Sequence, residues 1–132
     1  MYKRQIYDAI KHSKSPIDFY IESCACSMGS IIPQSAKTRY ISKYADFLIH
    51  LGTESLSGEF KSVQSTLKHL ETKTEIMFDI YAERCVNGQF FQDKKYGVAD
   101  TAKYLAEQVD KKAEWWLSSY EALKYGFVDQ IY

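Results

Sequence analysis

The sequence is poor in the residues that punctuate a chain, and it has no long apolar run. It contains only 2 Pro and 6 Gly among 132 residues, and no internal repeat or Pro-, Gly- or Ser-rich linker divides it. A chain of this length fits one domain of ordinary size, so residues 1–132 are expected to form a single domain. No stretch approaches the ~20 apolar residues that span a bilayer, and residues 1–5 (MYKRQ) do not open a signal peptide. We therefore expect a cytoplasmic protein without a membrane partner.

Cysteine is scarce as well, with Cys24, Cys26 and Cys85 as the only three. An odd number does not form a closed disulfide framework, and a C-x-C pair without a C-x-x-C lacks the spacing of a four-ligand zinc site. Buried, reduced thiols are the expected state of these residues. No cluster of Cys, His, Asp or Glu has the spacing of metal ligands, and phosphate-loop and dinucleotide-binding motifs are absent. Neither a metal nor another cofactor is therefore expected.

An excess of charge of one sign is also missing, since 17 Lys and Arg balance 17 Asp and Glu. The basic surface that marks a nucleic-acid-binding protein is thus not predicted, and no nucleic-acid partner is expected. What the sequence does have is aromatic residues, namely 11 Tyr, 7 Phe and 2 Trp. Such rings suit protein interfaces as well as cores.

The spacing of apolar residues predicts short strands that alternate with helices, which indicates a layered α/β fold. The helices are expected to end at residue 11 and to cover residues 27–36, 59–84, 101–112 and 118–126; the strands are expected at residues 17–21, 44–50 and 127–131. Asp100 is the expected cap of the fourth helix, and Ser118 with Glu121 forms a capping box before the last one. Gly126 is expected to stop that helix in a left-handed conformation.

The helix over residues 59–84 has the longest apolar pattern in the chain. At ~1.5 Å per residue it would extend close to ~40 Å, which is more than a compact core of this size needs. We expect it to project and to pack against another subunit, with packing inside its own subunit as the alternative.

Ser27 is the candidate nucleophile. It follows the small residues of segment 23–26 (SCAC) at an expected strand-to-helix turn, and such a turn exposes a hydroxyl next to free backbone N–H groups. The N–H of Met28 is the natural first donor to an oxyanion. The alternative is that Ser27 is simply the N-cap of the helix, which is the commoner use of serine at such a position.

His50 is the best-placed of the three histidines to act as a base. It ends a predicted strand and begins a loop, where functional side chains emerge in layered α/β folds. His12 lies at a helix end and His69 lies inside the long helix beside a lysine, so both are expected to be solvated.

Four segments in this order resemble the motifs of the ClpP family of serine proteases. They are residues 23–30 (SCACSMGS), 37–40 (KTRY), 47–50 (FLIH) and 116–129 (WLSSYEALKYGFVD). They are similar to that family's A-S-M-G turn, its K-x-R element, its strand ending in I-H, and its late L-S-A-x-E-A-x-x-Y-G-L-V-D segment. Residues 6–8 (IYD) resemble the start of a helix in the same family.

The resemblance implies a role for each matching residue. Ser27 would be the nucleophile, His50 the general base, and the Met28 N–H an oxyanion donor. Glu114 occupies the slot of the family's catalytic aspartate, and a glutamate is able to orient a histidine in its place. Asp110 is the fallback for this role. The alternative for both carboxylates is a solvated position at a helix end.

The resemblance also implies a fold, the layered ClpP/crotonase-like α/β fold with ββα-type repeats. Residues 59–85 would be the handle helix that joins two stacked rings, and the N-terminal strands would be missing. A Gly-Gly turn that supplies a second oxyanion donor in the family would be missing with them, and one such donor is worth ~2.7–4 kcal/mol in the transition state. Pro33 is expected to kink the helix after the nucleophile.

The function implied is that of a serine endopeptidase subunit. It would form a homo-oligomer of stacked rings and hydrolyse unfolded polypeptides delivered by an AAA+ unfoldase, with ATP bound only by that partner. A non-catalytic ring subunit of the same fold and an inactive fragment are the alternatives. An enoyl-CoA hydratase-like role, in which the Met28 N–H stabilises an enolate, explains neither Ser27 nor His50.

Overall fold

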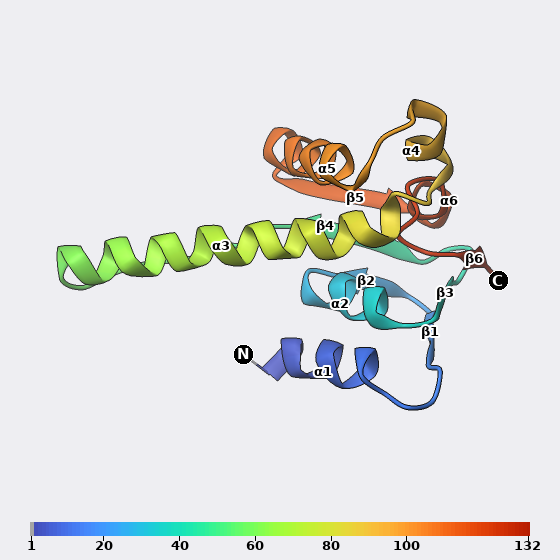
Figure 1. The fold of residues 1–132 in the computed structure, drawn as a ribbon, viewed down its shortest axis with the longest axis horizontal. Coiled ribbons are helices and arrows are strands. Elements are labelled where there is room, and N and C mark those ends of the chain that lie inside the picture. Colours follow the sequence, from blue (N-terminus) through green and yellow to red (C-terminus); the bar gives the residue numbers. More distant parts are fainter. Residues whose placement is uncertain (1) are drawn as a thin grey trace.

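Two small sheets carry the fold in this computed structural model, which describes residues 2–132 (Figure 1). The first sheet is parallel, with the order β1 (Asp18–Ile21), β3 (Thr38–Ile41) and β6 (Gln130–Ile131). The second has the order β2 (Cys24–Cys26), β4 (Asp46–His50) and β5 (Glu114–Ser118). In it, β2 runs parallel to β4 and β5 runs antiparallel to β4.

Six α-helices surround these sheets, which confirms the layered α/β class. They are α1 (Tyr2–Lys11), α2 (Met28–Ile31), α3 (Phe60–Cys85), α4 (Gln89–Lys94), α5 (Val98–Lys112) and α6 (Ser119–Lys124). A 3₁₀ helix over Ile32–Ser35 follows α2 directly, with Pro33 in its first turn. The expected helix over residues 27–36 is therefore present, but it changes from an α-helix to a 3₁₀ helix next to Pro33. None of the helices in residues 2–132 is long and apolar enough to cross a membrane.

One core joins buried residues of both sheets and of the helices around them, including α3 and α5. Strand β5 shows how a strand contributes to it, because its Trp115 and Leu117 are buried while the residues between and beside them are exposed. Phe127 contacts both Phe47 and Trp115 through stacked or edge-on rings, at centroid distances of 5.1 and 6.0 Å. Such aromatic pairs add ~0.5–1.5 kcal/mol beyond the burial of their area. Much of the aromatic content therefore holds the sheet and the helices together.

Helix α3 is buried over one half only. Its C-terminal part contributes Phe78 and Tyr81 to the core, whereas Phe60 is 73% exposed and Leu67 is 50% exposed. Figure 1 shows the N-terminal half of α3 extending well beyond every other element. The expected long, projecting helix is thus confirmed, with bounds one residue from those predicted. Its packing against another subunit stays a prediction.

Two predictions about local structure are wrong. Helix α5 begins at Val98 with Gly97 as its N-cap, and Asp100 lies in its first turn without capping it. Cys85 is buried, but Cys24 is exposed and Cys26 is half-buried, although all three are free thiols. The alternation of strand β2 explains this second difference, because it turns Ala25 into the core and the two cysteines away from it.

The C-terminal segment follows the prediction in part. Ser118 and Glu121 form the expected capping box at the start of α6. Gly126 follows that helix with a φ of +78°, in the left-handed region where glycine is favoured. The expected strand over residues 127–131 shortens to the two residues of β6.

Candidate active site

Ser27 sits in a strained turn between β2 and α2. Its φ of 56° and ψ of −125° lie where residues other than glycine are rare. The Ser27 N–H donates to the carbonyl of Leu48 on the neighbouring strand, at 3.1 Å. Its hydroxyl makes no capping hydrogen bond to α2, although the residue occupies the N-cap position. Ser27 therefore occupies the N-cap position of the alternative interpretation without acting as a side-chain cap. Its hydroxyl is left available for chemistry.

Ser30 and Tyr81 stabilise this turn through hydrogen bonds, and the sequence pattern identified neither of them as part of the site. The carbonyl of Ser27 accepts hydrogen bonds from the Ser30 N–H at 2.9 Å and from the Ser30 hydroxyl at 2.5 Å. Ser30 is fully buried, and its hydroxyl also lies 2.6 Å from the hydroxyl of Tyr81 on α3. Burial raises the pKa of Tyr81, so its phenol stays protonated at neutral pH. These contacts stabilise a backbone conformation that would otherwise cost ~1–3 kcal/mol.

Met28 is the first residue of α2. The N–H groups in the first turn of a helix have no partner within the helix, and the helix dipole adds partial positive charge there. The Met28 N–H therefore has the position that an oxyanion donor next to the nucleophile requires.

His50 ends strand β4, and this strand runs parallel to β2. Cys26 pairs with Leu48 in the ladder, so Ser27 and His50 follow the same edge of the sheet, at the carboxyl ends of neighbouring strands. Both residues line one cavity of about 750 Å³, bounded also by residues of α1, α3 and the loop after His50. The structure thus brings together the candidate nucleophile, Ser27, and the candidate base, His50, in one cavity. Of the other two histidines, His12 is exposed, and His69 is exposed at the rim of the same cavity.

Glu114 lies directly opposite His50 in the antiparallel pairing of β4 with β5. Cross-strand partners of this kind project from the same face of a sheet, with Cβ atoms ~4.5–5.5 Å apart. Asp110 is exposed on α5 and is not part of the sheet, so the register favours Glu114 over Asp110 as the neighbour of the histidine. The Glu114 carboxylate accepts a long hydrogen bond from Trp116 Nε1 at 3.4 Å. Within residues 2–132, the His50 side chain makes no hydrogen bond to the Ser27 hydroxyl or to the Glu114 carboxylate, which accepts only from Trp116.

Comparison with known proteins fits this geometry. Residues 2–132 match the family described as Clp protease. The chain belongs to the Clp protease family. Among its relatives are proteins named ATP-dependent Clp protease proteolytic subunit from Streptococcus sanguinis (strain SK36), 29% identical over 130 residues, and from Lactococcus lactis subsp. lactis (strain IL1403), 28% identical over 130 residues. The protein of that name from Deinococcus radiodurans is 25% identical over 128 residues.

Each of these alignments covers 96% of this chain but only 55–59% of the relative. The chain therefore spans less than two thirds of the length of the curated Clp protease subunits that it matches. This chain shares the family and the fold of these longer proteins. That it shares their activity is a proposal.

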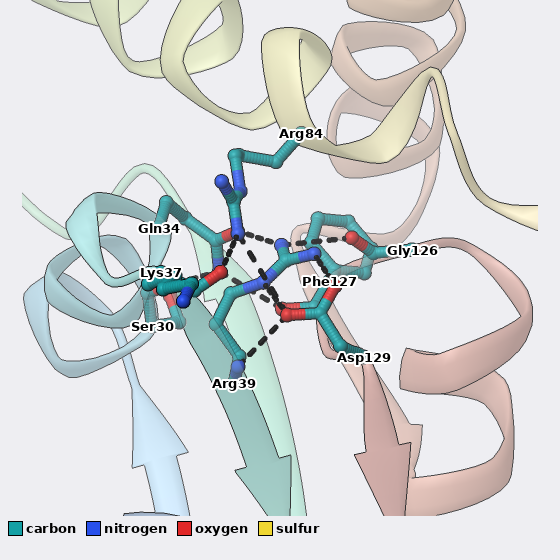
Figure 2. Close-up of polar contacts among 8 residues, drawn as sticks. All are labelled: Ser30, Gln34, Lys37, Arg39, Arg84, Gly126, Phe127 and Asp129. Carbon is teal, nitrogen blue, oxygen red and sulfur yellow. Dashed lines mark hydrogen bonds and ion pairs between the residues drawn. The ribbon is translucent and has the colours of Figure 1, made fainter. Parts of the chain in front are cut away.

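In this Clp protease family member, the arginine of the K-T-R-Y segment is a buried structural anchor (Figure 2). Arg39 donates from Nε and Nη2 to the two carboxylate oxygens of Asp129, at 2.9 and 2.5 Å. Its Nη1 donates to Gln34 Oε1 at 2.6 Å and to the Gly126 carbonyl at 2.9 Å. Gln34 in turn donates to the carbonyl of Ser30 at 3.0 Å. The late G-F-V-D segment is thus tied through hydrogen bonds to the helical turn that supports Ser27.

Within the described part of this Clp protease family chain, no group of three or more His, Cys, Asp or Glu side chains is arranged to hold a metal ion. The expectation that the protein uses no cofactor stays a prediction.

Proposed function

We propose that this chain carries the catalytic centre of a ClpP-like serine endopeptidase subunit. One observation carries the proposal. Ser27 lies in a positive-φ turn between a strand and a helix, with its hydroxyl uncommitted, and shares a cavity with His50 from the adjacent strand. A sharp strand-to-helix turn that exposes a serine hydroxyl beside a helix N-terminus is a recurrent way of presenting a nucleophile.

The proposed reaction is acyl transfer through Ser27. The Oγ attacks the peptide carbonyl while His50 takes the hydroxyl proton, and the negative oxygen that forms accepts a hydrogen bond from the Met28 N–H. His50 then gives that proton to the leaving amine. Water, activated by the same histidine, attacks the acyl-enzyme and releases the second product and the free serine. Glu114 stabilises the imidazolium that forms in each step.

The proposed setting is a homo-oligomer of stacked rings. Support comes from the exposed apolar residues in the projecting half of α3, because Phe60 and Leu67 together present an apolar surface that contact with another subunit would bury. The substrate class is unfolded polypeptide delivered by an AAA+ unfoldase, with ATP bound by that partner. The relatives' name, which includes the words ATP-dependent and proteolytic subunit, supports this setting.

Hydrolysis of a short fluorogenic peptide tests the proposal. The parent protein is expected to cleave the peptide, while Ser27→Ala and His50→Ala are expected to lose activity by ~10³-fold or more. Ser23→Ala is the matched control, because Ser23 is an exposed serine just before β2. Activity that survives Ser27→Ala would contradict the assignment of the nucleophile.

A non-catalytic ring subunit is the second candidate. It is favoured by the lack of side-chain hydrogen bonds from His50 to Ser27 and Glu114 within residues 2–132. Catalytic hydrogen bonds are often long in the absence of substrate, so we rank this function second. A protein that assembles into rings and yet cleaves no peptide, with or without an unfoldase, would establish it.

A further inference from the structure

A second cavity, of about 500 Å³, lies beside the Arg39–Asp129 pair. It is bounded by the C-terminal end of α3, by α6 and by the segment that follows α6. Neither Ser27 nor His50 contributes to its wall. The proposed hydrolysis makes no use of this cavity.

Positive charge predominates in its lining. Arg39, Arg84 and Lys124 line the cavity, while Asp129 is the only carboxylate that does so. Arg39 already engages both oxygens of that carboxylate. Arg84 Nη2 lies 3.7 Å from the Oδ2 of the same carboxylate (Figure 2). One carboxylate therefore serves two guanidinium groups, and the lysine adds a third positive charge.

Arg84 is the group with too few acceptors for its donors. Within residues 2–132 its one hydrogen bond goes from Nη2 to the carbonyl of Lys37, at 3.2 Å, and its Nε is buried without any partner. Burial lowers the pKa of Arg84, and repulsion from Arg39 lowers it further. A charged donor that is buried without an acceptor costs more than an unpaired neutral one. The arrangement would be stabilised by an additional negative group.

An oxyanion has the matching chemistry. A guanidinium presents its N–H groups in a planar fork that fits carboxylate and phosphate oxygens, and a lysine ammonium adds a mobile point charge. The cavity is larger than one such group, and it has charged donors on two of its sides, from α3 and from α6. Asp129 opposes an anion, but Arg39 neutralises it at close range.

We propose that this cavity is a binding site for a small oxyanion, a phosphate or carboxylate group, held by Arg84 and Lys124 next to the Arg39–Asp129 pair. The site is separate from the proposed catalytic centre. Its existence does not depend on whether Ser27 hydrolyses peptides.

Thermal unfolding of the full chain in increasing inorganic phosphate, at constant ionic strength, tests this site. A ligand that binds only the folded state raises Tm, by about 4–6 °C when its concentration is ten times Kd. Acetate, titrated in the same way, tells whether a carboxylate serves as well as a phosphate. The general effect of phosphate on protein hydration also raises Tm, but it does not saturate and acts on every variant alike.

Three substitutions separate the site from that general effect. Arg84→Gln and Lys124→Gln are expected to weaken the saturable shift by at least about threefold, since each removes one charged donor. Lys68→Gln, which makes the same charge change at an exposed position of α3 outside the cavity, is expected to bind as the parent does. Lys124 is exposed, so that variant stays informative even if Arg84→Gln fails to fold.

A saturable shift with phosphate or acetate that Lys124→Gln weakens and Lys68→Gln leaves unchanged supports the site. The proposal is overturned if neither anion gives a saturable shift, or if the shift is the same in Lys124→Gln as in the parent. Peptide hydrolysis, measured separately, reports on the catalytic proposal alone.

Discussion

The backbone at residue 27 leads to a quantitative prediction, because a Cβ atom is present where the chain favours glycine. At φ 56° and ψ −125°, the serine carries strain that costs ~1–3 kcal/mol. Replacing Ser27 by glycine removes the Cβ and with it the strain, while replacing it by alanine keeps both. Neither variant has the Ser27 hydroxyl, so a comparison of the two isolates the effect of the backbone from any effect of the hydroxyl.

The expected gain follows from two opposing contributions. Glycine relieves the strain, but it also gives the unfolded chain more freedom, which lowers stability by ~0.5–1 kcal/mol. The net expectation is that Ser27→Gly unfolds with a free energy ~0.5–2 kcal/mol higher than Ser27→Ala. For a chain of this size the difference corresponds to about 2–8 °C in Tm.

Urea unfolding followed by circular dichroism, at one fixed protein concentration, measures this difference. Ser23 provides the control, since it is exposed and is not among the residues with positive φ. At position 23 the order of stability of the glycine and alanine variants is expected to reverse. Ser23→Gly is expected to be less stable than Ser23→Ala by ~0.5–1 kcal/mol. If Ser27→Gly proves no more stable than Ser27→Ala, the reasoning about stored strain at the nucleophile is refuted.

Three further predictions concern the neighbours of the site. Glu114→Gln is expected to lower kcat/KM for a peptide substrate by about 10²-fold or more, whereas Asp110→Asn leaves it within about twofold; equal losses would contradict the register argument. Tyr81→Phe removes the hydroxyl that lies 2.6 Å from Ser30, and is expected to lower the free energy of unfolding by ~1 kcal/mol in urea titrations. Burial alone would raise the pKa of Asp129, but hydrogen bonds and the charge of Arg39 lower it below its usual value. The stability that Asp129 contributes is therefore present above the unfolded-state pKa of ~3.9 and is lost as the pH falls through the lower folded-state value. The Asp129 side chain is 34% exposed, so the free energy of unfolding is expected to differ between the parent and Asp129→Asn by ~1–3 kcal/mol at neutral pH. Urea unfolding over a pH series is expected to show that this difference shrinks in acid. A difference that does not depend on pH would contradict the pairing with Arg39.

The long elements and the positions of the candidate site residues were predictable from the sequence because their signals are local. The apolar spacing of α3 set its bounds to within a residue, and the S-x-x-E pattern identified the start of α6. Ser27 and His50 stood out because small residues and a strand end mark their positions. Their sharing of one cavity depends on the parallel pairing of β2 with β4, which no local pattern specifies.

Some short elements escaped prediction, among them β3, β5 and α4, because their signals are weak or conflict with those of their neighbours. Strand β5 follows α5 after a single residue, Ala113, whose φ of 59° turns the chain abruptly. A solvated helix end was therefore left as the alternative for Glu114, whereas the alternation of buried Trp115, exposed Trp116 and buried Leu117 is that of a strand. Helix α4 has only six residues, and β3 was apparent only as a family motif.

The supporting contacts of the site are long-range and were not predictable. Ser30 is bonded to Tyr81, 51 residues away, and Arg39 to Asp129, 90 residues away. The only local sign of the Ser30–Tyr81 contact was a small polar residue three positions after Ser27. The K-x-R and V-D motifs contain Arg39 and Asp129, but nothing in either motif indicates that the two side chains form a pair.

Covalent labelling with a fluorophosphonate, followed by mass spectrometry of the peptides, tests the central claim most directly. Such a probe phosphonylates a serine only when a base activates it. We expect modification at Ser27 in the assembled protein. We expect its loss both in Ser27→Ala and in His50→Ala, which keeps the serine but removes the proposed base. An unmodified Ser27, or labelling that is unchanged in His50→Ala, would contradict the assignment of these two residues as nucleophile and base.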